Sequence, residues 1–250
     1  MARSLRLVRE SAGDPTLDTA LSRVILDRVS GGDDPETLRL YRPQAHVAFG
    51  RQDAVHPGYP AAVAAARAEG FDAVERRAGG RAAVFHEDTV AFAWAVPDAS
   101  PRERIRERFE EVAALVVATL IKLGVEARVG EVPGEYCPGE WSVNARGRAK
   151  LMGVGQRVVR AATHVGGVIV VGGADRVRDV LVPVYRALEF PWDPATTGSI
   201  DAEIGAVDVD IVADAFAHEV GLVHDLGETP LDPALLRASE ERRDEFTPPG

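Results

Sequence analysis

The residues best suited to chemistry are a lone thiol and a rare amine. The chain has one cysteine, Cys137, and its 29 basic residues include only two lysines, Lys122 and Lys150. Cys137 and Lys150 share one stretch, GEYCPGEWSVNARGRAKLMGVGQR. A thiol is the strongest nucleophile among neutral side chains. In a chain that otherwise uses arginine, a lysine indicates a site that needs a compact ammonium rather than a planar guanidinium. Together the two residues indicate acyl-transfer chemistry.

A second cluster joins arginines, glycines and a histidine. Arg76 and Arg77 end one strand-like segment, Gly79 and Gly80 follow, and His86 ends the next such segment. Paired glycines let a backbone approach a ligand closely, although an ordinary hairpin turn uses the same residues. His86 fits either a strand end or a base. With no HxxxH spacing and no second cysteine, the sequence predicts no metal site.

Charge is unevenly distributed along the chain. The net charge of −10 argues against general binding of nucleic acids, which relies on basic surfaces. Residues 141–174 nevertheless contain no Asp or Glu. The basic residues of this stretch are Arg146, Arg148, Lys150, Arg157 and Arg160. Either these arginines face solvent on a strand pair, or they form an electropositive surface for an anionic ligand or acidic partner.

Composition indicates a soluble globular protein. A chain of 250 residues, 46% hydrophobic and 27% charged, can bury a substantial core. No apolar run reaches about 18 residues, so we expect no membrane span. The first residues lack the apolar core of a signal peptide. A single cysteine cannot form an internal disulfide, which fits a reducing cytoplasm.

The elements that must position these side chains follow from the hydrophobic pattern. Strands are predicted over residues 4–10, 37–42, 46–51, 73–77, 82–86, 89–96, 126–132, 150–160 and 164–171. Helices are predicted over residues 14–29, 59–69, 100–123, 174–188 and 207–220. Ser100 and Glu103 predict a capping box for the third helix.

Strands in runs, with helices between the runs, predict an α+β domain with a mainly antiparallel or mixed sheet and packed helices. We expect a single catalytic domain over residues 1–226. The remainder, 227–250, is rich in Glu, Asp, Arg and Pro and is predicted to be a partly mobile C-terminal tail.

Three ordered segments resemble the lipoate–protein ligase and octanoyltransferase family. RRAGGRAAVFHEDTVAFAWAV is similar to that family's RRxxGG-AVxHD signature, and ARGRAKLMGVGQR to its GxKxxGxaQ strand. LRLYRPQAHVAFGRQD is similar to its LxxyxP…sfGrxQ segment. Their order and spacing agree over residues 5–171. The resemblance implies the biotin/lipoate protein ligase catalytic-domain fold, which is class II synthetase-like. It also implies a channel for a C8 acyl chain.

The resemblance also implies roles for individual residues. Lys150 would contact the activated acyl carbonyl, and Cys137 lies in the loop where one octanoyltransferase branch carries its acyl group as a thioester. The substrate-binding residues implied are Arg76, Arg77, Gly79, Gly80, Arg81, His86, Gly153 and Gln156.

Three functions are compatible with these residues. The first is an acyltransferase that attaches an octanoyl or lipoyl group to a carrier-domain lysine through a Cys137 thioester, without a cofactor. The second is an ATP- and Mg-dependent lipoate–protein ligase that acts through lipoyl-adenylate, with Cys137 incidental. The third is a non-catalytic lipoyl-binding protein.

The expected partners follow from the same resemblance. The donor would be an acyl-carrier protein or free lipoate, and the acceptor a lipoyl domain or a glycine-cleavage H-type carrier protein. We expect a cytoplasmic monomer that binds neither nucleic acid nor membrane.

Overall fold

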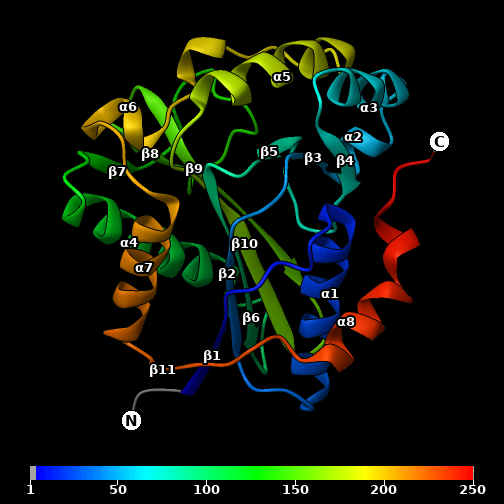
Figure 1. The fold of residues 1–250 in the computed structure, drawn as a ribbon, viewed down its shortest axis with the longest axis vertical. Coiled ribbons are helices and arrows are strands. Elements are labelled where there is room, and N and C mark those ends of the chain that lie inside the picture. The colour runs from blue at the N-terminus through cyan, green and yellow to red at the C-terminus, as the bar shows by residue number, and fades with distance from the viewer. Residues whose placement is uncertain (1–3, 250) are drawn as a thin grey trace.

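The computed structural model describes residues 4–249 and contains two sheets enclosed by helices (Figure 1). The larger sheet has eight strands in the order β11-β1-β2-β6-β10-β9-β8-β7, and the smaller has the order β4-β3-β5. The strands of the larger sheet are β1 (Ser4–Val8), β2 (Thr37–Tyr41), β6 (Thr89–Pro97), β7 (Ala127–Val129), β8 (Val143–Ala145), β9 (Ala149–Val158), β10 (Ala162–Val170) and β11 (Asp225–Glu228). Those of the smaller sheet are β3 (His46–Phe49), β4 (Asp72–Glu75) and β5 (Ala83–Phe85).

The larger sheet is mixed and mainly antiparallel. β1 pairs in parallel with both β11 and β2, whereas every neighbouring pair from β2 to β7 is antiparallel. In the smaller sheet β3 is parallel to β4 and antiparallel to β5. The predicted α+β fold with a mainly antiparallel or mixed sheet is therefore confirmed.

Helices cover both faces of the larger sheet. On β6, Val90, Phe92 and Trp94 join the core under α4 and α7, whereas Ala95 joins the core under α1 and α8, because alternate residues of a strand face opposite ways. The smaller sheet packs with α3 and α5 (Figure 1). The helices are α1 (Pro15–Gly31), α2 (Arg51–Ala54), α3 (Tyr59–Ala68), α4 (Ile105–Lys122), α5 (Ala174–Ala187), α6 (Ile200–Ile204), α7 (Val209–Gly221) and α8 (Pro233–Glu240). Among the helices of residues 4–249, none combines the length and apolar character needed to cross a membrane.

Helix α1 is fixed at both ends and on its buried side. The Asp14 side chain caps it by accepting from the Leu17 N–H, and Gly32 ends it in the left-handed conformation. On its inner side Asp18 Oδ1 lies 2.5 Å from Nη2 of Arg39 on β2, and both side chains are buried. This pair holds α1 against the sheet.

The predicted capping box at residues 100–103 does not form. Helix α4 begins at Ile105, and Arg104 occupies the N-cap without a side-chain hydrogen bond. Asp98 instead accepts from the Ser100 N–H at 2.9 Å and pairs with Arg108 at 3.4 Å. Bonded to this carboxylate, the chain makes a turn over residues 101–104 before the helix starts.

The segment predicted as a C-terminal tail contains regular structure. The expected boundary at residue 227 falls inside β11, and α8 and a short 3₁₀ helix, η2 (Arg243–Phe246), follow. Arg242 and Arg243 pair with Asp27 and Asp14 at 2.6 and 2.7 Å, and Phe246 is buried. The charged composition did not indicate this packing, because the segment is attached by backbone pairing to β1 and by a few apolar residues, Leu235 and Phe246 among them, as well as by ion pairs to α1.

Candidate active site

A cavity lies between the two sheets, and its space, opening included, is about 980 Å³. Its floor is the face of β9 and β10 that carries Gly153, Gly155 and Gly166. Gly155 is directly opposite Gly166 in the antiparallel register, so both occupy one face. Because these positions have no side chains, the floor stays open.

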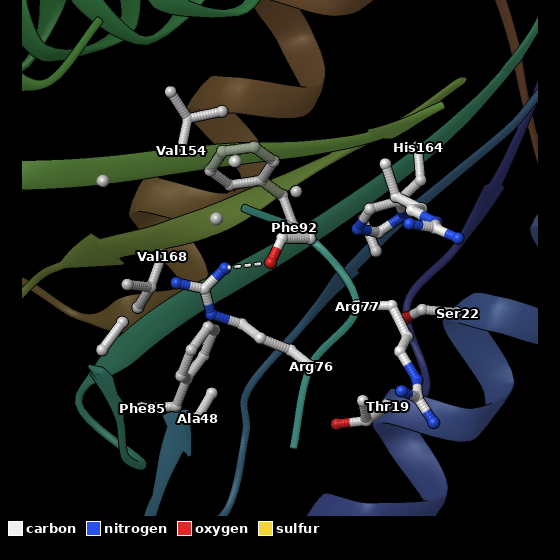
Figure 2. Close-up of a pocket in the computed structure, with 18 of the residues that line it drawn as sticks. Thr19, Ser22, Ala48, Arg76, Arg77, Phe85, Phe92, Val154, His164 and Val168 are labelled. Atoms are coloured by element: carbon white, nitrogen blue, oxygen red, sulfur yellow. Dashed lines mark hydrogen bonds between the residues drawn. The ribbon is translucent and has the colours of Figure 1, made fainter. Parts of the chain in front are cut away.

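The walls of the cavity differ in character (Figure 2). Ala48 and Phe85 of the small sheet and Val168 of β10 make an apolar region. On the other side, Thr19 and Ser22 of α1 lie near Arg77. The cavity therefore offers one region for a hydrocarbon chain and another for polar groups.

Cys137 lines this cavity from the loop between β7 and β8. Its Sγ accepts a hydrogen bond from the Arg81 backbone N–H at 3.1 Å. Nη2 of Arg76 lies 3.9 Å from the same sulfur. Positive charge and N–H donors beside a partly exposed thiol are typical of reactive cysteines.

The arginine–glycine turn is shaped around this sulfur. Arg76 donates to the carbonyl oxygens of Ala78 at 2.9 Å and Arg81 at 2.6 Å, and also to that of Gly79. Gly80 has φ +98°, and a Cβ built there would lie 2.9 Å from both Cys137 Sγ and Arg76 Nη2. Only glycine combines this backbone conformation with such close approach.

The backbone of Cys137 is held from both sides. Its φ of +42° is unusual for a residue with a side chain. Its N–H donates to Tyr185 Oη at 3.0 Å, and that hydroxyl donates to the Ala82 carbonyl at 2.8 Å. Burial raises the pKa of Tyr185 well above its usual value, so the phenol keeps the proton it donates. The Cys137 carbonyl accepts from Lys150 Nζ at 2.7 Å.

Lys150 is 1% exposed and completely hydrogen-bonded. Besides the Cys137 carbonyl, its Nζ donates to Glu135 Oε1 and to the Tyr136 carbonyl, both at 2.9 Å. Glu135 is also buried and accepts from Ser142 Oγ at 2.5 Å. An ammonium has three N–H donors, so contact with an acyl carbonyl would have to replace one of these bonds.

The segment of residues 38–53 supports the same site from behind. A Cβ at Gly50 would lie 2.0 Å from the Gly80 carbonyl oxygen, so the two turns touch through their backbones. Asp53 Oδ1 lies 3.4 Å from Arg81 Nη1, while its Oδ2 accepts from the Gly50 N–H at 3.0 Å. Burial raises the pKa of Asp53. Two of the segments that carried the family resemblance thus contact Cys137, through Arg81 and Lys150, and the third supports the Gly80–Arg81 turn from behind.

Most of the residues predicted for the site are gathered around this cavity. Those that line it are Arg76, Arg77, Gly79, Cys137, Lys150 and Gly153. Gly80 and Arg81 adjoin it through their contacts with the Cys137 sulfur.

Two predicted residues lie elsewhere. Gln156 is not among the cavity-lining residues, and its Nε2 donates to the Ile105 carbonyl at 2.7 Å. His86 is fully buried outside the cavity, where its ring packs against Gly173 and its Nδ1 accepts from the Asp88 N–H at 3.2 Å. Burial and then the Arg176 charge lower the pKa of His86 to about 4. This placement does not support the predicted pocket-lining role of His86.

Several residues of the site were not predicted from the sequence. The only available signal for Glu135 was its position two residues before Cys137. No sequence pattern indicated Tyr185, because it lies on α5, far along the chain from the Cys137 that it contacts. His164 lines the cavity from β10, where burial and then Arg39 and Arg76 lower its pKa to about 4. Within residues 4–249, no three His, Cys, Asp or Glu side chains group closely enough to hold a metal ion.

Sequence comparison places this site in a known context. A family model described as the lipoyl protein ligase A/B catalytic domain matches residues 14–218. The octanoyl-[GcvH]:protein N-octanoyltransferase of Geobacillus kaustophilus is 28% identical over 187 residues, covering 73% of this chain and 66% of that protein. The protein of the same name from Anoxybacillus flavithermus is 27% identical over 177 residues, covering 69% and 63%. The chain thus spans just under two thirds of the length of these relatives.

Structural comparison identifies the fold. A crystal structure of lipoate-protein ligase A bound with ATP matches with a TM-score of 0.79 and 19% identity, covering 98% of this chain and 95% of that one. The bipartite lipoate protein ligase of Thermoplasma acidophilum matches with a TM-score of 0.73 and 18% identity, covering 98% and 93%. At these identities the likeness establishes a shared fold.

Proposed function

Because the chain belongs to the lipoyl protein ligase A/B catalytic-domain family, we propose that it transfers an octanoyl or lipoyl group to a carrier-protein lysine through a thioester on Cys137. The observation that carries the proposal is the setting of the Cys137 sulfur. It lines the cavity, accepts the Arg81 N–H and lies beside the Arg76 guanidinium. The names of the relatives, which describe octanoyl transfer between proteins, support the same reaction.

The first step forms the acyl-enzyme. Cys137 Sγ bonds to the carbonyl carbon of an acyl thioester donor, the bond from that carbon to the donor sulfur breaks, and the donor leaves as a thiol with the proton that Cys137 gives up. The Arg76 guanidinium and the Arg81 N–H would stabilise the thiolate that attacks. The acyl chain would lie along Ala48 and Phe85.

The second step transfers the acyl group to the acceptor. The lysine amine of the carrier bonds to the acyl carbon, the bond from that carbon to Cys137 Sγ breaks, and the proton that the amine loses returns to the Cys137 sulfur. Lys150 and Glu135 would hold the loop that carries the sulfur through both steps. Lys150 would contact the acyl carbonyl only by giving up one of its present hydrogen bonds.

The proposed partners are carrier proteins. The donor would be an acylated carrier protein; the relatives' name gives octanoyl-GcvH, an H-type carrier, as their donor. The acceptor would be a lipoyl domain or a glycine-cleavage H-type carrier protein. The proposed compartment is the cytoplasm, where a lone reactive thiol stays reduced. ATP and Mg would be needed only in the ligase alternative.

The intact mass of the protein tests this function. The wild type, incubated with octanoyl-carrier protein and no ATP, should gain one octanoyl group, and Cys137→Ser should gain none. Labelling of a lipoyl domain by Cys137→Ser that requires ATP, without any adduct on the wild type, would instead identify a ligase. Binding of lipoate with no transfer by either route would identify a non-catalytic binding protein.

A further inference from the structure

Two adjacent arginines point into different parts of the cavity (Figure 2). Arg76 extends toward Phe85, whereas Arg77 extends toward Thr19 on α1. The Arg76 guanidinium is occupied by three backbone carbonyls and lies beside the Cys137 sulfur. Arg77 therefore belongs to the polar region, on the far side of Arg76 from the apolar wall.

Arg77 is held in place without a carboxylate. Its Nη2 donates to the backbone carbonyl of Glu245 at 3.0 Å, and its guanidinium lies 5.7 Å from the centre of the Phe246 ring. Both contacts come from η2, which is anchored to α1 by Arg242 and Asp27. The Glu245 carboxyl bonds to Arg242, which lowers its pKa, and the charge of Arg77 adds a smaller effect. A carbonyl and an aromatic ring thus orient the Arg77 guanidinium without forming an ion pair with it.

Arg157 is a second such cation. It lines the cavity from β9, opposite His164 on β10. Like Arg77 it is exposed, so both stand where the cavity opens to solvent, and no group of residues 4–249 forms a hydrogen bond or ion pair with its guanidinium. Within the same acid-free stretch Arg146 pairs with Glu203, and Lys150 pairs with Glu135.

The neighbouring carboxylates are already paired. Asp27 bonds to Arg23 at 2.8 Å and to Arg242 at 2.6 Å, and Glu245 bonds to Arg242 at 2.7 Å. In a chain of net charge −10, this region of the cavity keeps two positive charges, those of Arg77 and Arg157, without acidic partners. Guanidinium groups are well suited to bind phosphate oxygens.

We propose that Arg77 and Arg157 form a subsite for the phosphate of the acyl donor, a thioester carried on a phosphorylated arm. This inference rests on the proposed function. The acyl chain lies along the apolar wall, the thioester carbonyl meets Cys137 beside Arg76, and the phosphate binds in the polar region. The subsite thus favours donors that carry phosphate.

Two small donors that differ by one phosphate test the subsite, namely octanoyl-4′-phosphopantetheine and octanoyl-pantetheine. Acylation of Cys137 is measured at several donor concentrations by intact mass. For the wild type at low salt, the KM of the phosphorylated donor should be lower by about tenfold or more, the size of one charge-assisted contact. In Arg77→Gln/Arg157→Gln the ratio of the two KM values should fall close to one.

Arg160→Gln is the matched control. Arg160 is an exposed arginine close to Arg157 in sequence, and it does not line the cavity. Its loss removes one positive charge, as each substitution of the double variant does, and should leave the ratio of KM values as in the wild type. A reduction of the ratio by Arg160→Gln equal to that in the double variant would overturn the subsite.

The remaining outcomes separate this inference from the proposed function. Equal KM values for both donors in the wild type, with Cys137 acylated, overturn the phosphate subsite and leave the transferase intact. Acylation of the wild type by neither donor overturns both. A defect of the double variant only with octanoyl-carrier protein assigns the arginines to an acidic carrier surface. A defect only in ATP-dependent labelling assigns them to a nucleotide. Either of these last two results overturns the proposal.

Discussion

The ammonium of Lys150 holds Cys137 by its main chain, donating to the Cys137 carbonyl oxygen at 2.7 Å. Lys150 also bonds to Glu135 and to the Tyr136 carbonyl, so three acceptors surround a single nitrogen. A planar guanidinium cannot donate to three acceptors gathered around one point. The presence of lysine at position 150, in a chain that otherwise prefers arginine, therefore has a structural reason.

Glu135→Gln should destabilise the fold and slow acylation. The substitution leaves the buried Lys150 ammonium without its counter-charge, which costs about 3–5 kcal/mol in the free energy of unfolding. Urea denaturation measures the loss, and intact mass measures the rate at which Cys137 is acylated. Glu131→Gln removes the same charge from an exposed position of the same loop and should cost within about 0.5 kcal/mol. Equal losses in the two variants would contradict the role of the buried pair.

Gly80→Ala should damage the site more than the fold. Its new Cβ would lie 2.9 Å from the Cys137 sulfur, which would have to move, and we expect acylation to slow by about 10- to 100-fold. Gly70→Ala is the control, because Gly70 also has positive φ, at +80°, with open space around it. Both variants carry the backbone strain, but only Gly80→Ala should lose acylation. Wild-type acylation rates in Gly80→Ala would refute the close packing at the sulfur.

Tyr185→Phe should loosen the Cys137 loop. The Cys137 N–H and the Ala82 carbonyl both lose a partner, which lowers the free energy of unfolding by about 1–3 kcal/mol. Acylation of Cys137 should slow, because its left-handed backbone is then held only through Lys150. Tyr59→Phe, which removes a hydroxyl bonded to Glu75, should reduce stability without slowing acylation. If Cys137 is acylated at the wild-type rate in Tyr185→Phe, the Tyr185 hydroxyl does not position Cys137.

His86 should make the fold sensitive to acid. Its pKa is about 4 in the folded protein against 6.5 for a free side chain, so between these values the unfolded chain binds more protons. The free energy of unfolding should therefore fall as the pH drops from 6.5 to 4, with His86 contributing on the order of 2–3 kcal/mol.

Urea denaturation of the wild type and His86→Asn at pH 7 and at pH 4.5 measures this contribution. The asparagine oxygen can still accept the Asp88 N–H but does not titrate in this range. Titration of other groups is common to both proteins, so the difference between them reports His86. Parallel losses of stability in the two proteins would show that His86 does not titrate as described.

The local patterns predicted most elements for direct physical reasons. Strands β9 and β10 occur within a few residues of their predicted bounds, because their apolar side chains alternate and must face one core. The predicted start of α4 was wrong by five residues, because Asp98 bonds to Ser100 and Arg108 and the chain turns before the helix begins. β11 and α8 were not predicted, because few apolar residues stand among the charged ones of their segment. β11 is held by backbone pairing to β1, and α8 by Leu235, which packs in the core beside α1.

The sequence by itself determined which residues are candidates for the chemistry, since a lone thiol, a rare lysine and the arginine–glycine turn are properties of composition and order. It also predicted the family, because three motifs kept their spacing. Only the tertiary structure decided which groups each of these residues contacts. Contacts between groups distant in the chain, such as Tyr185 and Glu245, are not visible in the sequence. These contacts decide which partners Lys150 has, whether His86 faces the cavity and which arginines lack acidic partners. Those contacts arise only when the two sheets and the C-terminal segment pack together.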